Sequence, residues 1–350
     1  MTCEVINLLQ KGLVINFPDE SNCIQRLDFR IFKFSTTSPM TLKKLLILLI
    51  FTFACSLTIH AQTKKDQNLQ ASVEELTKSF HGDIGIYIEN LKTGASVEIN
   101  ADTIFPTASI VKIPILLGVF DKIEKGELDY RESLIYRDSI KYGGSGIMQF
   151  FKDSTQTDLS ILLALMLSYS DNTTSLWNQA LAGGGIQINQ VLESLGYEYT
   201  KVNSRTPGRE SNWEKYGWGQ TTPKEMADIL VRMNKKELIS PAASDQMYRL
   251  LSNTFYIDYA VSGIPSGINV ASKQGMVNGS RSEVYLVNSP QGDYVCAIFT
   301  KNNEDESWEY DNEAWVVTRE ISNLIWNYFN PNQPYSQPEG LKKYLEGLQY

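Results

Sequence analysis

The stretch "FPTASIVKIP", Phe105–Pro114, places a serine and a lysine one helical turn apart among apolar residues. The sequence from Ser109 predicts a long, largely apolar helix that ends at Gly126, with Pro114 near its first turn, where proline is tolerated. Residues i and i+3 share one face of a helix, so Ser109 and Lys112 are expected to lie side by side. Lys112 can therefore be a base that activates Ser109, or a helix residue whose amine reaches past its apolar stem to water.

A second segment with suitable chemistry is Ser170-Asp171-Asn172, at a break between two helical runs. Here a serine hydroxyl can relay a proton, and an asparagine amide can hold both a lysine and a substrate amide. The alternative is helix capping, for which Ser, Asp and Asn are favoured in any protein.

A third segment, Lys-Gln-Gly at residues 273–275, lies on a predicted strand. Its lysine would supply a second positive charge, and its glycine would let another backbone approach closely. The N–H of Met276 can join that of Ser109 in an oxyanion hole, and the guanidinium of Arg281 can bind a carboxylate. The alternative is an edge strand protected by charged side chains.

The composition excludes several other kinds of site. The chain of 350 residues has a formal net charge of −8, which argues against a nucleic-acid partner. It has two histidines, His60 and His81, so a histidine-rich zinc site and an imidazole base are both disfavoured. Of the four cysteines only Cys296 lies beyond residue 61, which leaves no intramolecular disulfide there. We expect no metal and no cofactor.

The N-terminal region predicts export. Met40 opens a segment with two lysines, the apolar run Leu45–Ile59 and a small residue, Ala61, which together fit a signal peptide over 40–61. The apolar run is short for a membrane span, so we expect no stable span in the mature chain and a periplasmic location. Residues 1–39 are interpreted as an upstream extension, and Cys55 does not fit a lipid-attachment site. The alternative is a cytoplasmic tail with an anchoring helix.

The order of elements predicts an α/β (α+β) fold. A helix and a hairpin open the mature chain, a helical stretch fills its middle, and strands and a closing helix end it. We expect one antiparallel sheet built from both ends of the chain, flanked by the terminal helices, with an all-helical subdomain beside it. We expect a catalytic domain over 62–332 and a flexible tail over 333–350. Within the catalytic domain, the sheet part is expected at about 66–105 and 260–330, and the helical part at about 106–259.

Taken together and in this order, the three segments resemble the active-site serine family of class A β-lactamases and penicillin-binding proteins. The resemblance runs from about Phe80 to Phe329 and includes "TTP" before a helix and "GSR" after the third segment. It implies an antiparallel sheet with a helical subdomain. It also implies an acylated nucleophile at Ser109, a base or relay at Lys112, a second hydroxyl at Ser170, a substrate-amide ligand at Asn172, a substrate-pairing strand at Lys273, Gln274, Gly275 and Met276, and a carboxylate anchor at Arg281.

The sequence departs from this family at two places. Gln274 stands where the family has Thr or Ser, which removes a small hydroxyl that helps to hold a lactam carboxylate. The loop before Thr221 also lacks the family's Glu-x-x-Leu-Asn stretch, whose glutamate drives water onto the acyl-enzyme. Glu210 and Glu214 are the candidates for that task, and the alternative for both is a solvated loop side chain.

Three hypotheses for function follow. The first is an exported serine hydrolase that opens β-lactams or related amides through an acyl-enzyme on Ser109, with Lys112 as the base. The second keeps the fold but has slow deacylation, as a penicillin-binding protein or peptidoglycan amide hydrolase. The third is a non-catalytic exported binding protein on this scaffold. In each case the partner is a small β-lactam or a peptidoglycan-like molecule, and we expect a monomer.

Overall fold

The computed structural model describes residues 63–338. The predicted extension over 1–39 and the predicted signal over 40–61 lie outside these residues, as does the end of the predicted tail. None of the helices in the described part of the chain combines the length and the apolar character needed to cross a bilayer.

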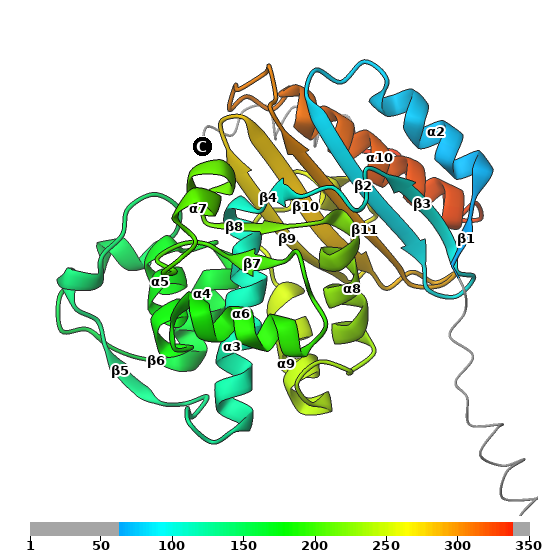
Figure 1. Ribbon diagram of the computed structural model, residues 1–350. Helices are drawn as coiled ribbons and strands as arrows, with labels where there is room; N and C mark the ends of the chain where they lie inside the picture. Colours follow the sequence, from blue (N-terminus) through cyan, green and yellow to red (C-terminus); the bar gives the residue numbers. More distant parts are fainter. Residues whose placement is uncertain (1–62, 339–350) are drawn as a thin grey trace, which may run out of the picture. The chain divides into compact units, whose positions relative to one another are not determined.

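The main sheet of the described residues has six strands in the order β1-β3-β2-β11-β10-β9, so both ends of the chain contribute to it (Figure 1). Its strands are β1 Lys64–Lys65, β2 Asp83–Asn90, β3 Ala95–Ile99, β9 Val270–Val277, β10 Ser280–Val287 and β11 Tyr294–Lys301. All neighbouring pairs are antiparallel except β1 with β3, which is a parallel pair two residues long. The predicted fold class is confirmed, with β1 as an addition at one edge.

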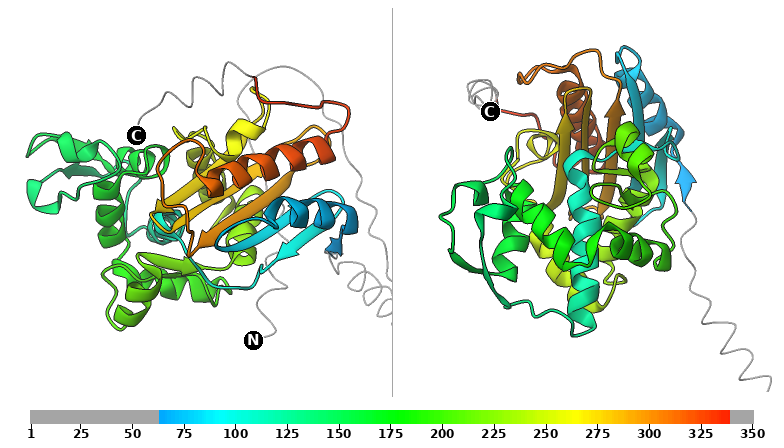
Figure 2. Two further views of the ribbon diagram at one scale, coloured as in Figure 1. Left: turned by 90° about the horizontal axis from the view of Figure 1, so that it is seen from above. Right: turned by 60° about the vertical axis from the view of Figure 1, so that its left-hand side comes forward.

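One face of this sheet is covered by the two terminal helices, α2 Gln67–Thr77 and α10 Glu313–Phe329, which lie side by side (Figures 1 and 2). Because side chains alternate along a strand, Ile86 and Ile88 of β2 face these helices while Tyr87 faces the other way. Ile86 and Ile88 share one apolar cluster with Leu69 of α2 and Trp326 of α10. Burying these side chains is the main source of stability for this layer.

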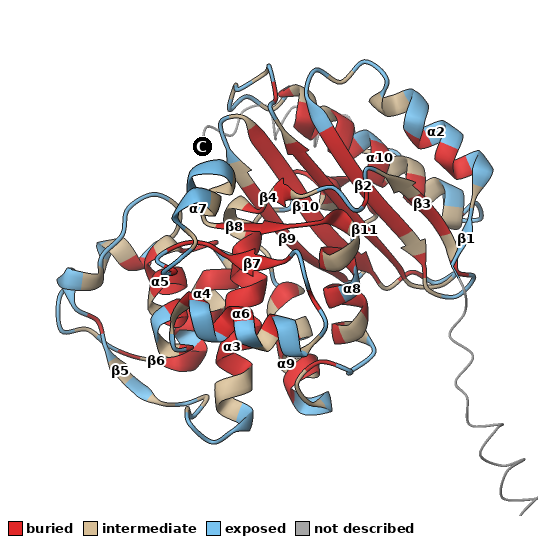
Figure 3. Cartoon of the chain, viewed as in Figure 1, coloured by how far each residue is buried: buried red, intermediate tan, exposed pale blue. Residues whose placement is uncertain are grey.

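The other face of the sheet packs against the helical part of the chain, whose core is the second large apolar cluster (Figure 3). The helices there are α3 Lys112–Glu124, α4 Leu159–Ser168, α5 Asn172–Leu181, α6 Gly184–Ser194, α7 Glu210–Tyr216, α8 Pro223–Asn234 and α9 Pro241–Leu251. As predicted, Thr222 caps α8 by accepting a hydrogen bond from Glu225 N at 3.1 Å, with Pro223 in the first helical position. The sequence interpretation did not include α9.

The stretch 200–220, expected to be a loop before Thr221, contains two short strands and a helix. Strand β7 Lys201–Val202 and strand β8 Gly219–Thr221 enclose α7, and β8 pairs with β4 Phe105–Pro106. This pairing fixes the chain directly before Ser109 against the end of the 200–220 stretch. The remaining short elements are β5 Ser133–Ile135, β6 Gln156–Asp158, and the 3₁₀ turns η1 Ala108–Val111, η2 Asp138–Ile140, η3 Met148–Phe150 and η4 Ala260–Gly263.

The first part of the predicted flexible tail is held against α10. The indole Nε1 of Trp326 donates to the Gln333 carbonyl at 2.8 Å, and the Asn327 side chain accepts from Tyr335 N at 2.7 Å. These contacts order the chain at least as far as Tyr335.

Candidate active site

Ser109 lies in a 3₁₀ turn, η1, directly before the predicted helix. In a 3₁₀ turn residues i and i+3 are eclipsed, which places Lys112 directly over Ser109. The Lys112 Nζ lies 3.0 Å from Ser109 Oγ, and the lysine side chain has no exposed surface. The interpretation of Lys112 as a residue reaching to water is therefore wrong.

The segment Ser170–Asn172 meets this lysine from the junction of α4 and α5. Lys112 Nζ lies 2.9 Å from Ser170 Oγ and 3.0 Å from Asn172 Oδ1, and it also contacts the Ser170 carbonyl oxygen. Asp171 caps α5 through Thr174 N at 2.8 Å and also accepts from Met148 N at 2.7 Å. Both interpretations of this segment therefore hold: Asp171 caps a helix, while Ser170 and Asn172 contact Lys112.

Strand β9 brings the second lysine to the same hydroxyl. Lys273 Nζ lies 3.1 Å from Ser170 Oγ, 2.8 Å from the Gln274 carbonyl oxygen and 3.0 Å from Gln274 Oε1. β9 is an edge strand of the sheet, but Lys273 is fully buried, so it does not protect that edge by facing water.

The two buried amines have lowered pKa values. Burial lowers the pKa of Lys112 to about 7, while Asp171 acts in the opposite direction. Burial and the charge of Lys112 both lower the pKa of Lys273 well below its usual range. Each amine also lies within hydrogen-bond distance of Ser170 Oγ, so protonation of one opposes protonation of the other.

The acceptors around each amine indicate which one is the base. Lys273 faces three oxygens that can all accept, which matches the three N–H groups of an ammonium. Lys112 faces two oxygens that can only accept, on Ser170 and Asn172, and two hydroxyls. A neutral amine can donate to those two oxygens and still accept a proton from the Ser109 hydroxyl.

Gly275 is the point where β9 contacts the turn that carries Ser109. A β-carbon on Gly275 would lie 2.3 Å from the Thr107 carbonyl oxygen and 3.1 Å from Ile110 N, and both are backbone atoms. The close backbone approach predicted at Gly275 is therefore made by the turn of this same chain that contains Thr107 and Ile110.

Replacing Gly275 by alanine is expected to lower the free energy of unfolding by about 1–3 kcal/mol, because this contact cannot relax without moving η1. The same displacement should lower activity through Ser109. Gly279→Ala is the matched control, since its nearest neighbour would be a side-chain atom, Glu306 Oε1, at 3.4 Å. Urea denaturation of both variants checks this; equal stability of Gly275→Ala and the wild type would contradict the contact.

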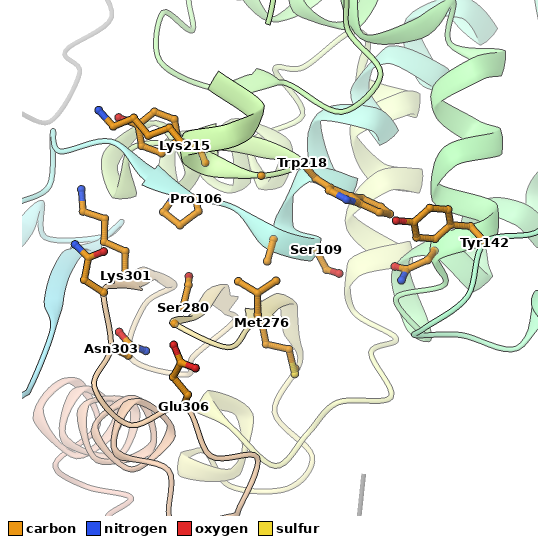
Figure 4. A pocket seen from close by; sticks show the side chains of 17 residues that line it. Pro106, Ser109, Tyr142, Lys215, Trp218, Met276, Ser280, Lys301, Asn303 and Glu306 are labelled. Carbon is orange, nitrogen blue, oxygen red and sulfur yellow. The ribbon is translucent and has the colours of Figure 1, made fainter. Parts of the chain in front are cut away.

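Ser109 opens onto two cavities. One has a volume of about 650 Å³ and the other about 460 Å³, and Ser109, Asn172 and Met276 line both. Figure 4 shows Ser109 in the larger cavity with Trp218 and Tyr142 on one side and Met276 on the other. The smaller cavity has an aromatic wall, formed by Tyr256, Tyr259, Trp308, Tyr310 and Trp315.

Arg281 lines neither of these cavities. Its side chain has no exposed surface, and its terminal nitrogens donate to backbone carbonyls. The acceptors are Val277, Asn278 at 2.8 Å, Ser280 at 3.2 Å, Glu306 at 3.3 Å and Ser307 at 2.9 Å. The Trp308 ring lies over the guanidinium at 4.4 Å. Arg281 thus fastens the β9–β10 turn to the 306–308 loop, and the structure does not bring it beside Ser109.

Glu210 and Glu214 lie on α7 and also line neither cavity that Ser109 lines. They border a third cavity of about 610 Å³, which shares Tyr142 and Trp218 with the larger one. These two rings contact edge to face, with centroids 5.4 Å apart. The aromatic pair thus stands between the glutamates and the Ser109 hydroxyl.

The sequence interpretation missed these aromatic residues. No motif in the sequence marks Tyr142 or Trp218 as a neighbour of Ser109. Trp308 and its neighbours carry no sequence pattern that places them near Ser109, because that depends on the Arg281 contacts.

Comparisons with known proteins agree with this geometry. Residues 68–329 match the model of the β-lactamase enzyme family. β-Lactamase VEB-1 from Pseudomonas aeruginosa is 25% identical over 82% of this chain and 98% of its own length. Extended-spectrum β-lactamase PER-1, also from Pseudomonas aeruginosa, is 21% identical over 71% of this chain and 84% of its own length.

Among solved structures, that of PBP-A superposes with a TM-score of 0.69 at 25% identity, covering 77% of this chain and 98% of PBP-A. A mutant of PBP-A was solved as an acyl-enzyme complex with penicillin G, and it superposes with a TM-score of 0.68 at 25% identity over 77% of this chain and 99% of its own. The family model spans most of the described residues and includes all three motif segments. The chain therefore belongs to the β-lactamase enzyme family and has the class A fold.

Proposed function

We propose that this chain is a serine hydrolase that opens β-lactams through an acyl-enzyme on Ser109. The observation that carries the proposal is the buried amine of Lys112, 3.0 Å from Ser109 Oγ and 2.9 Å from Ser170 Oγ. Membership of the β-lactamase family and the likeness to VEB-1 and PER-1 support the substrate class.

In the first step Ser109 Oγ attacks the lactam carbonyl carbon, and its proton passes to Lys112 Nζ. The pKa of about 7 lets Lys112 be neutral near neutral pH and accept that proton. The N–H groups of Ser109 and Met276 are proposed to stabilise the oxyanion, since both residues line the two cavities that meet at the hydroxyl.

In the second step the ring C–N bond breaks and the nitrogen must take up a proton. Ser170 Oγ lies between the two lysine amines, so we assign it the relay from Lys112 to the leaving nitrogen. Asn172 is proposed to hold the substrate amide, with its Nδ2 already oriented by the Gly143 carbonyl at 3.2 Å. Water then hydrolyses the ester and regenerates the Ser109 hydroxyl.

We further propose that the protein is exported through the segment 40–61 and acts as a monomer. All of the side chains assigned above come from one chain. Edman sequencing of the secreted form, with a mature end at Gln62, would test the export proposal.

The direct test of function is incubation with penicillin G followed by mass spectrometry of the intact and digested protein. We expect an adduct with the mass of the intact penicillin on the peptide that contains Ser109, together with turnover of a chromogenic cephalosporin. Ser109→Ala is the control and should show neither. A wild-type protein with no adduct and no turnover would contradict the proposed function.

A further inference from the structure

The cavity of about 610 Å³ beside α7 takes no part in the proposed reaction. Most of its walls come from Tyr142, the turn at 203–207, α7 and Trp218, and they include none of the residues assigned to chemistry at Ser109. Its volume lies within the range of about 300–1,000 Å³ that is usual for small-molecule sites. The groups on its walls indicate what kind of molecule it can bind.

Three aromatic rings, those of Tyr142, Trp213 and Trp218, supply apolar surface to this cavity. Trp213 is 51% exposed and Tyr142 is 40% exposed, so both rings present surface to solvent. In the described part of the chain, the indole N–H groups that donate hydrogen bonds are those of Trp308 and Trp326. The two indoles of this cavity therefore combine apolar ring surface with an uncommitted N–H donor.

Arg205 occupies a backbone position that arginine rarely takes. Thr206 N donates to the Asn203 carbonyl at 3.2 Å, which closes a turn whose third residue is Arg205, with a φ of 49°. Glycine or asparagine is favoured at such a position, because a positive φ crowds the β-carbon of other residues. The guanidinium lies over the Tyr142 ring at 6.0 Å and makes no ion pair or hydrogen bond within residues 63–338. Backbone strain of this kind is concentrated at functional sites.

The cavity also has acceptors without donors. Glu210 and Glu214 lie one turn apart on α7, where two like charges repel each other. Glu210 Oε1 accepts from Gly208 N at 3.0 Å, whereas the Glu214 carboxylate has no ion pair or hydrogen bond with any described residue. Ser204 is 4% exposed, and its hydroxyl likewise has no hydrogen-bond partner in the described ranges. The cavity thus combines uncommitted groups of both charge signs with aromatic surface.

We propose that this cavity is a binding site for a saccharide. An anion would meet the two glutamates and a cation would meet Arg205, whereas a neutral ligand with many hydroxyls can donate to Glu214 and accept from Arg205 at the same time. The apolar C–H face of a sugar ring can pack on Trp213, with its hydroxyls directed to the polar walls. The proposal does not depend on which bond Ser109 opens, and it gives the protein a second ligand.

This site adjoins the catalytic one. Tyr142 and Trp218 also line the 650 Å³ cavity, where Figure 4 shows both rings on the same side of Ser109. Trp213 and Arg205 line the 610 Å³ cavity but neither of the two cavities at Ser109, so they can be changed without touching the catalytic groups.

The test is isothermal titration calorimetry of the full chain with cellobiose and with N,N′-diacetylchitobiose, and with glycylglycine as a zwitterionic peptide. We expect at least one disaccharide to bind with a Kd of about 1 mM or tighter. Trp213→Ala should weaken that binding about 10-fold or more through the loss of ring surface. Arg205→Asn should also weaken it, while the melting temperature stays near the wild-type value because asparagine suits a positive φ.

Phe150→Ala is the matched control for Trp213→Ala. Phe150 is 79% exposed and lines none of the three cavities, so this variant should bind the disaccharide as the wild type does. Turnover of a chromogenic cephalosporin should be unchanged in Trp213→Ala and Arg205→Asn, which would separate the saccharide site from the catalytic site.

No binding of either disaccharide at about 10 mM, or binding that neither Trp213→Ala nor Arg205→Asn weakens, would overturn the saccharide site and leave the proposed function intact. Binding of glycylglycine but of neither disaccharide would also overturn it and would assign the cavity to peptides. A wild-type protein that binds a disaccharide but forms no adduct with penicillin G would instead support the saccharide site and overturn the proposed function alone.

Discussion

Replacing Lys112 by methionine is expected to lower the rate of acylation of Ser109 by about 10²- to 10⁴-fold, the range for loss of a positioned general base. The Nζ contacts both serine hydroxyls, so no other amine can take the Ser109 proton without a rearrangement. Lys273 is the nearest alternative, but its three oxygen contacts occupy it. The rate is measured by rapid quench and mass spectrometry of the penicillin adduct.

The fold of this variant should persist. Methionine fills a similar volume, and its introduction removes a polar amine that is fully buried. Asn172 Oδ1 and the Ser170 carbonyl oxygen each lose a hydrogen-bond donor, and this loss offsets the stability gained by removing the buried amine. A melting temperature near the wild-type value with acylation abolished would support a chemical role. Acylation at more than a tenth of the wild-type rate would exclude Lys112 as the base.

The pH dependence of acylation gives an independent check on the same residue. Because Lys112 acts as a base only when neutral and its pKa is about 7, the wild-type rate should rise with pH through about 7 and then level off. Lys112→Met should lose this rise. A wild-type rate that is flat between pH 5 and 9 would show that another group limits the step.

Much of the architecture follows from local patterns in the sequence. Alternating residues such as Ile86, Tyr87 and Ile88 predict a strand with two different faces, and both faces are buried by different layers. Thr222 before Pro223 predicts the start of α8, because both residues act through local hydrogen bonding and backbone geometry. The order of elements then predicted one antiparallel sheet built from both ends of the chain, but periodicity alone does not determine which distant strands pair.

The features that the sequence did not predict depend on contacts between distant segments. The 200–220 stretch has weak local preferences, and its strands form because β8 pairs with β4 and β7. The orientation of Arg281 depends on the path of the 306–308 loop, so a motif alone could not distinguish a carboxylate anchor from a side chain bound to backbone carbonyls. Likewise, the glutamates and Ser109 border different cavities that meet at the packed rings of Tyr142 and Trp218, a contact between distant segments.

Replacing Glu283 by glutamine is expected to remove a large pH dependence of stability. Glu283 lies on β10 with no exposed surface, and its carboxylate accepts from Ala260 N at 2.7 Å and from Ser272 Oγ at 2.5 Å. Burial raises its pKa from 4.5 to about 7, although those two hydrogen bonds act in the opposite direction. Below about pH 7 the folded protein therefore favours the neutral acid over the carboxylate.

The sign of the effect follows from proton binding. Between pH 4.5 and about 7 the folded protein keeps this proton while the unfolded chain releases it, so the free energy of unfolding falls as pH rises. The pKa shift corresponds to about 3 kcal/mol of the free energy of unfolding. This contribution is fully present below pH 4.5 and is lost once the pH has passed about 7. Glutamine stays neutral throughout, so its contribution should not vary with pH.

A glutamine also fits the contacts that Glu283 makes. Its oxygen can accept from Ala260 N, and its amide nitrogen can donate to Ser272 Oγ, since a hydroxyl both donates and accepts. The difference in the free energy of unfolding between the variant and the wild type should therefore grow by about 3 kcal/mol as the pH rises from 5 to 8. Urea denaturation at each pH measures this difference. Glu75→Gln, at a side chain that is 77% exposed, is the matched control and should not change this dependence. If the wild-type and Glu283→Gln curves run parallel across this pH range, Glu283 is ionised in the folded protein and the sheet holds a buried charge beneath Lys273.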